Sequence, residues 1–306
     1  MKTLPKVSAL AALCCTLAMG SGQAFAASSA SVTMGPLSIL LVDLNPLDGI
    51  APSITFAESE WWYGTSYTNA SVSDYGTGAY DSASGYSDTV WGSSSSNASI
   101  PGTWATASVS GSGSPNGTTI SASGSTQGTQ GTQGSSNYAT YNAQAAAPGY
   151  YYYGGTFTLS DNTAVIFSAS ISGDVAVTGT FDPNSTYGWE HAHVQGDLST
   201  WGTGASGTGS QNASDSFALS ASSTYLADDS ALWGYVYGPS SATGTQSLAV
   251  AFVNVSGGDL GGYLYANVNA YGYSYVAAVP EPETYAMLLA GLGIIGAAAR
   301  RRQKAA

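Results

Sequence analysis

The second half of the chain alternates apolar and polar residues with a period of two. Between residues 263 and 276, tyrosines and asparagines alternate with a set of apolar residues, namely Leu264, Ala266, Val268, Ala270 and Val276. Because successive side chains of a strand point to opposite faces, this alternation predicts one long antiparallel strand with a buried apolar face. Residues 231–237 and 247–255 are predicted as further strands, the second of them ending in a polar turn at 256–259.

A second group of strands is predicted between residues 150 and 181. The pattern favours strands at 150–160, 164–172 and 175–181, joined by turns at residues 161–162 and 173–174. The apolar residues of these strands alternate with small or polar ones. They predict a meander with one buried face, formed by Phe157, Leu159, Val165, Phe167, Ile171, Val175 and Val177.

The first half of the chain gives shorter signals. Residues 38–44 predict a buried strand, residues 45–49 a turn, and residues 52–56 and 103–109 two further strands. Residues 111–134 are low in complexity and offer little to bury, so an exposed and mobile loop is expected there. Such a loop either separates a small N-terminal lobe from the rest or forms an excursion between two strands of one sheet.

These strands and turns predict an all-β fold for the body of the chain, which we define as residues 27–279. No segment of the body has a helical period, and an antiparallel β-sandwich or jelly roll is expected. A β-helix or solenoid is the second choice, without a fixed repeat period to support it. With 21 Tyr and 7 Trp but few Leu, Ile, Val and Phe residues, aromatic rings should provide much of the buried surface.

Charge is distributed very unevenly along the chain. All six Lys and Arg residues lie at positions 2, 6, 300, 301, 302 and 304, whereas all 18 Asp and Glu residues lie between positions 27 and 283. A body without cations cannot neutralise phosphates, which excludes nucleic acid as a partner. The same acidity attracts divalent cations, so calcium is a candidate ligand. The alternative is that the charge merely keeps an extracellular protein soluble.

The N-terminus has the features of a secretory signal peptide. Lys2 and Lys6 precede an apolar run at residues 7–19, and a small residue, Ala24, lies two positions before Ala26. This order predicts cleavage after Ala26, with the Sec translocon and signal peptidase as partners.

Both cysteines, Cys14 and Cys15, fall inside this predicted signal peptide. A lipoprotein would need a small residue before the modified cysteine, and Leu13 is not small. The mature chain is therefore expected to contain no disulfide, no cysteine nucleophile and no zinc–thiolate site.

The C-terminus has the features of a membrane anchor. Residues 280–283 alternate proline and glutamate, and residues 284–299 are uncharged and mostly apolar. As a helix this stretch would span about 24 Å, which is short for a bilayer core of about 30 Å but can be accommodated by snorkelling arginines. The basic residues that follow, Arg300, Arg301, Arg302 and Lys304, predict a single transmembrane helix with its C-terminal end in the cytoplasm.

This order of a Pro-Glu-Pro triplet, an apolar span and an arginine cluster resembles the PEP-CTERM sorting signal of Gram-negative bacteria, over residues 279–304. The resemblance implies processing by exosortase, a membrane cysteine enzyme, and delivery to the surface or matrix of bacteria that make exopolysaccharide. It also implies that Pro280, Glu281 and Pro282 form the recognition element, which is a substrate site and not a catalytic one. The chain then divides into a signal peptide (1–26), the body (27–279) and a sorting segment (280–306).

The same tail contains the dinucleotide-binding pattern GxGxxG at residues 291–296. That motif requires a βαβ unit and an acidic residue about 20 positions further on, and only ten residues follow Gly296. Close packing of a membrane helix through small residues is the better interpretation.

Candidate catalytic residue types gather in one place, at residues 190–193. On a strand, His191 and His193 point to the same face, so both imidazoles can reach one metal ion. Asp197 or a distant acid would have to supply a third ligand. The alternative is that the two histidines are simply polar residues of an exposed strand or loop.

Two other acidic groups are candidate sites. The oxygens of Asp43, Asn45 and Asp48 can bind calcium, but they lack the EF-hand spacing, and a turn is the favoured interpretation. Glu58 and Glu60 would share a strand face beside two tryptophans, an arrangement that permits glycoside hydrolysis. The favoured alternative is a strand end whose tryptophans pack inward.

These features predict a non-enzymatic protein of the cell surface or extracellular matrix. We expect it to be exported, anchored transiently in the inner membrane, and then to contribute to a biofilm or envelope rich in exopolysaccharide. A carbohydrate-binding or metal-binding surface module is the alternative, and a secreted glycan hydrolase is the least favoured of the three.

Overall fold

The computed structural model describes residues 27–57, 65–127, 138–148, 155–178, 190–203, 210–229 and 234–275. These residues belong to one compact unit that spans Phe25–Ala277. Every strand pair among them is antiparallel, and no α-helix occurs within the described ranges. None of the described residues forms a helix long and apolar enough to cross a membrane. The expected signal peptide and transmembrane helix lie outside the described residues.

One sheet contains seven strands. Six follow the order β16-β11-β1-β8-β7-β6, and β2 also pairs with β11. β1 and β2 succeed one another beside the long strand β11, since β1 pairs with residues 171–177 and β2 with residues 163–168. The bounds are β1 (Ala27–Met34), β2 (Ser38–Asp43), β6 (Gly92–Ile100), β7 (Thr103–Ser112), β8 (Thr119–Gln127), β11 (Thr163–Val177) and β16 (Ser240–Asn254).

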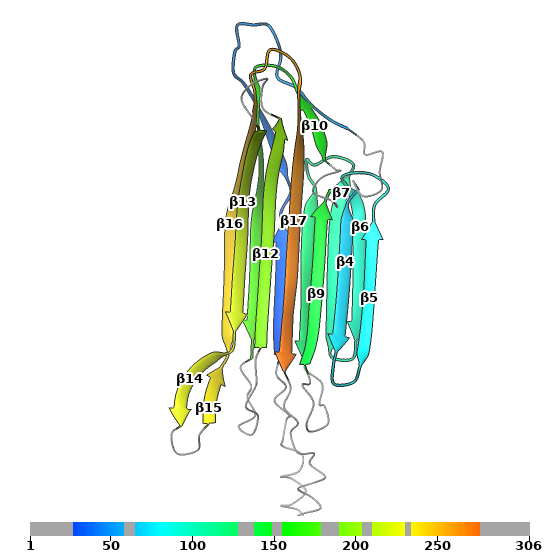
Figure 1. Ribbon diagram of the computed structural model, residues 1–306, viewed down its shortest axis with the longest axis vertical. Coiled ribbons are helices and arrows are strands. Elements are labelled where there is room, and N and C mark those ends of the chain that lie inside the picture. Colours follow the sequence, from blue (N-terminus) through cyan, green and yellow to red (C-terminus); the bar gives the residue numbers. More distant parts are fainter. Residues whose placement is uncertain are drawn as a thin grey trace, which may run out of the picture. The chain divides into compact units, whose positions relative to one another are not determined.

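The other large sheet contains eight strands in the order β13-β12-β17-β9-β4-β5, with β10 paired to both β17 and β3. Figure 1 shows the six strands of the main path side by side. Their bounds are β3 (Ile54–Phe56), β4 (Tyr67–Asp74), β5 (Ala79–Tyr86), β9 (Tyr138–Ala147), β10 (Thr156–Leu159), β12 (Glu190–Thr203), β13 (Ser210–Ser222) and β17 (Leu260–Tyr275). A separate hairpin pairs β14 (Thr224–Asp229) with β15 (Gly234–Gly238).

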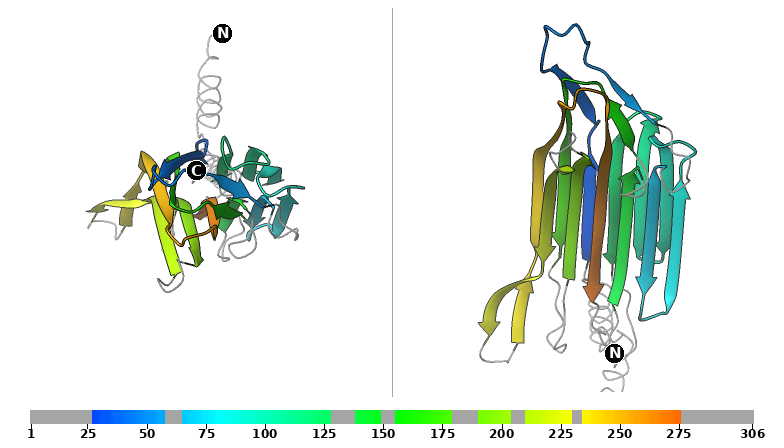
Figure 2. Two further views of the ribbon diagram at one scale, coloured as in Figure 1. Left: turned by 90° about the horizontal axis from the view of Figure 1, so that it is seen from above. Right: turned by 45° about the horizontal axis from the view of Figure 1, so that its top comes forward.

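The two large sheets pack face to face as a β-sandwich (Figure 1, Figure 2). β8 lies against β9 and β17, β1 against β12 and β17, and β4 against β6 and β7. The core between them is made by alternate residues of each strand. Its largest fully buried side chains include Met34, Trp91, Ile120, Tyr141, Phe157, Phe167, Leu198, Leu248 and Phe252. Phe157 lies at the centre of an aromatic cluster, with ring centroids 5.3 Å from Phe167 and 5.2 Å from Phe252.

The prediction of an all-β, antiparallel sandwich is confirmed for the described residues. The alternating stretch at 263–276 forms β17, and its residues Leu264, Ala266, Val268 and Ala270 are buried as expected. The predicted buried face of the meander is also confirmed, because each of its seven apolar residues lies in the core.

The predicted turn at Gly173-Asp174 is wrong. Both residues lie inside the continuous strand β11. The residue at 173 is glycine because side chains of the opposite sheet fill the space above it. A Cβ atom there would lie 2.9 Å from the ring of Phe217 and 2.9 Å from a methyl group of Val194. Glycine thus marks a close approach between the sheets and not a turn.

The prediction of an exposed loop at 111–134 is also wrong in part. Residues 119–127 form β8, which lies inside the seven-stranded sheet between β1 and β7. Its small inward residues suffice because the ring of Tyr141 from the other sheet occupies the space above Gly124. Residues 128–134 lie outside the described residues.

The strand predicted at 38–44 is present as β2, but it is not buried. Leu40 is 58% exposed and Leu44 is 44% exposed, and only the alternate residues Ile39 and Leu41 pack against the core. β2 pairs with β11 alone, so one of its edges carries no partner strand among the described residues.

Side chains from one sheet cap the outer edges of the other. The Gln211 amide donates from Nε2 to the Val253 carbonyl oxygen (2.6 Å) and accepts from the Val253 amide at Oε1 (3.0 Å). Four residues along β13, Asp215 Oδ2 accepts from the Ala249 amide at 3.0 Å. At the other end of the sandwich, Asp81 Oδ2 accepts from the Ser99 amide of β6 at 2.8 Å. These contacts satisfy backbone groups that an edge strand otherwise leaves open.

Candidate functional site

The outer face of the eight-stranded sheet carries most of the described aromatic and amide side chains that do not enter the core. Because inward residues such as Val194 and Val268 are buried, their strand neighbours point outward. We call the following side chains the amide–aromatic face: Tyr67 and Asn69 of β4; Asn142 and Gln144 of β9; His191, His193, Gln195, Asp197 and Trp201 of β12; and Tyr263, Asn267, Asn269, Tyr271 and Tyr273 of β17.

Strand register aligns four amides of this face in one row across the sheet. Gln195 is paired with Asn269, Asn269 with Gln144, and Gln144 with Asn69. We call these four residues the amide row. Adjacent strands lie about 4.8 Å apart, so each strand contributes one amide group at that interval. Every side-chain amide can donate and accept hydrogen bonds at the same time.

Rings lie on both sides of the amide row. On one side, the His193 and Tyr271 ring centroids are 4.9 Å apart. On the other side, Tyr67 of β4 and Tyr86 of β5 are 5.0 Å apart. Tyr271 is 39% exposed and Tyr86 is 47% exposed, so each presents part of a ring to solvent. Burial and the neighbouring Tyr86 raise the pKa of Tyr67, although its bond to Asn69 opposes the shift.

A third ring pair lies further along β12 and β17, the strands that carry His193 and Tyr271. The Trp201 and Tyr263 rings are nearly parallel, with an interplanar angle of 6° and centroids 5.2 Å apart. They are directly paired across β12 and β17. Stacked pairs of this kind form rigid apolar platforms on an otherwise polar face.

The prediction that His191 and His193 share one face of a strand is confirmed. Their ring centroids are 6.1 Å apart, and the rings are inclined by 16°. His191 Nδ1 is 3.0 Å from Ser222 Oγ, and its ring packs against Tyr273. Burial lowers the pKa of both histidines, and the neighbouring His193 lowers that of His191 further.

The structure does not bring a third metal ligand to the histidines. Asp197 lies on the same face, but its Oδ2 accepts a hydrogen bond from Gln195 Nε2 at 2.9 Å. Glu190 points to the other side of the strand, where its Oε1 accepts from Thr178 Oγ1 at 3.1 Å. In the part of the chain that the structure describes, no three His, Cys, Asp or Glu side chains group so as to hold a metal ion.

The side-chain oxygens of Asp43 and Asp48 stabilise turns, and the backbone carbonyl of Asn45 accepts from the Asp48 amide at 3.1 Å. Asp43 Oδ1 accepts from the Asn45 amide at 2.9 Å, and Asp48 Oδ1 accepts from the Ile50 amide at 2.7 Å. The other oxygen of Asp48 accepts from Asn162 Nδ2 at 2.8 Å. This geometry matches the favoured turn interpretation.

The remaining predicted site residues lie outside the described residues. They are the cleavage-site residues Ala24 and Ala26, the acidic pair Glu58 and Glu60 with the tryptophans that follow it, the sorting triplet Pro280, Glu281 and Pro282, and the basic cluster Arg300, Arg301 and Arg302.

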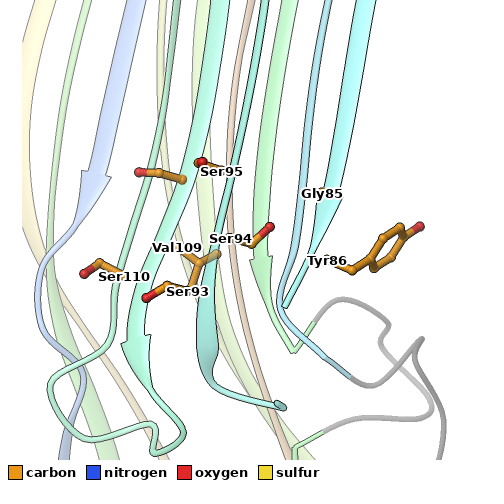
Figure 3. A pocket seen from close by; sticks show the side chains of 8 residues that line it. Gly85, Tyr86, Ser93, Ser94, Ser95, Val109 and Ser110 are labelled. Carbon is orange, nitrogen blue, oxygen red and sulfur yellow. The ribbon is translucent and has the colours of Figure 1, made fainter. Parts of the chain in front are cut away.

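The opposite face of the sandwich has a different chemistry. The outward residues of β6, β7, β8 and β1 are mainly serine and threonine, and hydroxyl groups bond across strands, as between Ser108 and Ser121 (2.7 Å). An open hollow of about 440 Å³ lies where this face meets β5 (Figure 3). Serines and Tyr86 provide its polar lining, without any carboxylate or imidazole group.

Sequence reasoning missed the amide row. Its members lie on four strands that are far apart in the chain, and only their register aligns them. The one local signal was the presence of Asn267 and Asn269 on the tyrosine face of the stretch at 263–276.

Comparison with known proteins identifies the tail. The family model of the PEP-CTERM protein-sorting motif matches residues 278–302. No curated protein matches the chain. The motif marks an exported protein that is sorted by exosortase, as the triplet at 280–282 predicted. The chain is therefore a PEP-CTERM domain-containing protein.

Proposed function

We propose that this protein is a non-catalytic component of the cell surface or extracellular matrix. After export, exosortase processes its C-terminal segment, and the β-sandwich then contributes adhesive contacts to a matrix rich in exopolysaccharide. The observation that carries this proposal is the sorting motif at residues 278–302, joined to a body that presents a broad polar and aromatic sheet face.

The chemistry of that face supports binding in preference to turnover. Glycoside hydrolysis uses two carboxyl groups on opposite sides of the scissile bond. On the amide–aromatic face the acidic side chain is Asp197, and it is already held by Gln195 at 2.9 Å. Amides and rings, by contrast, are the groups that hold sugars through hydroxyl hydrogen bonds and stacking.

Fractionation of the native host, with and without its exosortase, tests the sorting part of the proposal. The wild-type strain should release a product that lacks residues from the tail, whereas the deletion strain should accumulate a membrane-held form that retains them. Intact-mass measurement distinguishes the two forms. Equal masses and equal distributions in the two strains would contradict the proposal.

The adhesive part is tested with the processed protein and exopolysaccharide isolated from the same host. We expect retention of the protein on the immobilised polysaccharide and no release of reducing ends over many hours. Rapid cleavage of the polysaccharide by the purified protein would show instead that it is a hydrolase.

Metal binding is a second candidate function, favoured by the side-by-side imidazoles of His191 and His193. Alanine at both positions should then abolish uptake of zinc or copper, measured by elemental analysis after dialysis against the metal. Unchanged metal content in the double variant would remove this candidate.

A further inference from the structure

We propose that the amide row binds an uncharged polysaccharide, whose chain runs across the strands of the eight-stranded sheet. This inference rests on the proposed adhesive function and assigns its site and ligand class. Gln195, Asn269, Gln144 and Asn69 come from four adjacent strands and are aligned by direct register. Each strand therefore places one amide in the path of a ligand that crosses it. Gln195 Nε2 also donates to Asp197 Oδ2 (2.9 Å) and Asn269 Nδ2 to Asn142 Oδ1 (3.2 Å), and because an amide NH2 group has two hydrogens, each of these amides keeps a second one for the ligand.

Spacing and hydrogen-bond capacity fit a glycan chain. The interval between amides is the strand spacing of about 4.8 Å, which is close to the length of one sugar unit in an extended polysaccharide. A sugar hydroxyl both donates and accepts a hydrogen bond, and so does a side-chain amide. Successive sugar units can then meet successive amides without any bend in the sheet.

The ring pairs beside the row supply the apolar contacts. Tyr271 and Tyr86 are partly exposed on opposite sides of the row and at different strands. A sugar ring has one face of C–H groups, and such a face stacks on the negative face of an aromatic ring. The rings thus contact the bound segment from either side of the row while the amides hold its hydroxyl groups.

Charge decides the ligand class. The body contains no Lys or Arg, and Asp197 lies next to the row, so an acidic polysaccharide would be repelled. A second copy of the chain, with a formal net charge of −12, would be repelled for the same reason. A neutral polysaccharide is not subject to this electrostatic repulsion.

The test compares two double variants of the processed protein. Gln144→Ala with Gln195→Ala removes two amides of the row, and Asn97→Ala with Gln127→Ala removes two exposed amides from the opposite face. The probe is the host's exopolysaccharide, separated by anion exchange into neutral and acidic pools. Melting temperature and sedimentation velocity verify that each variant is folded and report its oligomeric state.

We expect the wild-type protein to bind the neutral pool and not the acidic pool. The row variant should bind about tenfold more weakly, since two hydrogen bonds are lost, while the opposite-face variant stays within about twofold. Equal binding by both variants, or a preference for the acidic pool, would overturn this site while leaving the adhesive function intact. Binding to neither pool would overturn both, and a loss of self-association in the row variant would identify a second copy as the occupant.

A separate observation concerns the start of the body. Ala27, the residue after the predicted cleavage position, begins β1 in the interior of the seven-stranded sheet. Its backbone nitrogen donates to Thr178 Oγ1 at 2.9 Å, and Thr178 Oγ1 donates to Glu190 Oε1 at 3.1 Å. Glu190 is only 3% exposed.

We infer that removal of residues 1–26 creates an α-ammonium group at Ala27 that binds the Glu190 carboxylate through Thr178 and thereby stabilises the mature fold. Cleavage converts the neutral Ala27 amide into a cation without moving it. Hydrogen bonds between charged groups are roughly twice as strong as those between neutral groups. Between residues 27 and 283 the sequence supplies neither lysine nor arginine, so this ammonium brings a positive charge to an acidic body.

Selective acetylation tests this inference on the processed protein. Because the body has no lysine, an amine-reactive acetylating reagent modifies its α-amino group, and hydroxylamine reverses any reaction with tyrosine. Acetylation should lower the melting temperature of the wild-type protein by about 2–4 °C, and by much less in Glu190→Gln. A control, Asp197→Asn, should keep the full effect of acetylation. Equal shifts in wild-type and Glu190→Gln proteins, or an N-terminus other than Ala27, would overturn the inference.

Discussion

Tyr141 fits into the core because two glycines leave room for its ring. A Cβ atom at Gly124 would collide with the ring, and one at Gly272 would collide with the Tyr141 hydroxyl and with Ser28 Oγ. Since Ser28 Oγ donates to the His191 carbonyl oxygen (2.6 Å), the Tyr141 hydroxyl donates to Ser28 Oγ (3.3 Å). Burial raises the pKa of Tyr141 well above its usual range. The sequence does not reveal the packing role of these two glycines, because the residues that flank them resemble those that flank glycines in turns.

Enlarging one of these glycines should therefore destabilise the protein. We expect Gly124→Ala to lower the free energy of unfolding by about 1–3 kcal/mol through overpacking, and Tyr141→Phe to lower it by about 1 kcal/mol through loss of one hydrogen bond. Urea unfolding followed by tyrosine and tryptophan fluorescence measures both. Gly258→Ala is the control, because a Cβ atom there meets nothing within 4 Å. A neutral Gly124→Ala would contradict the packing described here.

The two histidines should make stability depend on pH. Their pKa values are lowered in the folded protein, so the unfolded chain binds protons more readily below the ordinary histidine pKa of 6.5. The stabilisation is fully present above that pH, and the free energy of unfolding should fall as the pH decreases through it. Melting temperatures between pH 8 and pH 5 measure the change.

The matched variant is His191→Gln with His193→Gln. Carboxylates also titrate at low pH in both proteins, so the informative quantity is the difference between the two pH profiles. The double variant should show a smaller loss of stability between pH 7 and pH 5.5. Parallel profiles would mean that the histidines titrate alike in the folded and unfolded chains.

At the scale of the element, strand period was predictable and strand ends were not. β17 and the buried face of β10 and β11 follow from alternation alone, since a side-chain period of two belongs to the strand itself. The turn at 173–174 and the part of the 111–134 loop that forms β8 were mispredicted, because glycine and serine in the sequence do not reveal what packs above them. The amide row was beyond local reasoning for the same cause, as register is set by partners on other strands.

The capped edges lead to a prediction about association. Gln211→Ala with Asp215→Ala exposes the backbone groups of Val253 and Ala249 on β16. Unpaired edge groups promote pairing with another chain, so the double variant should form dimers or larger aggregates to a greater extent than the wild-type protein does. Size-exclusion chromatography with light scattering measures the effect. Ser214→Ala, which changes the opposite side of the same strand, should leave the mass unchanged, and a monodisperse double variant would refute the capping role.

At the scale of the whole molecule, targeting was predictable because its signals are short and local. The Pro-Glu-Pro triplet, the apolar span and the arginine cluster occupy consecutive residues, and the family model matches the same region at 278–302. The ligand class that we propose for the body was not predictable in this way. It rests on a surface whose residues are aligned only by strand register.

Substitution in the triplet should uncouple export from processing. Pro280→Ala, Glu281→Ala and Pro282→Ala together should leave the tail in place and the protein in the membrane fraction, as judged by mass and fractionation. Glu283→Ala changes the next acidic residue and should be processed normally. Release of the triple variant at the wild-type rate would exclude the triplet as the recognition element.

β1 is the first strand to emerge from a translocon that threads the chain from its N-terminus, yet both of its neighbours are distant in sequence. It lies between β8 and β11, so its two ladders stay empty until residues 119–127 and then 163–177 have crossed. Pairing over such separations is slow, because long loops must close first. The interior of the seven-stranded sheet therefore forms late, and a chain halted midway through secretion lacks both partners of its first strand.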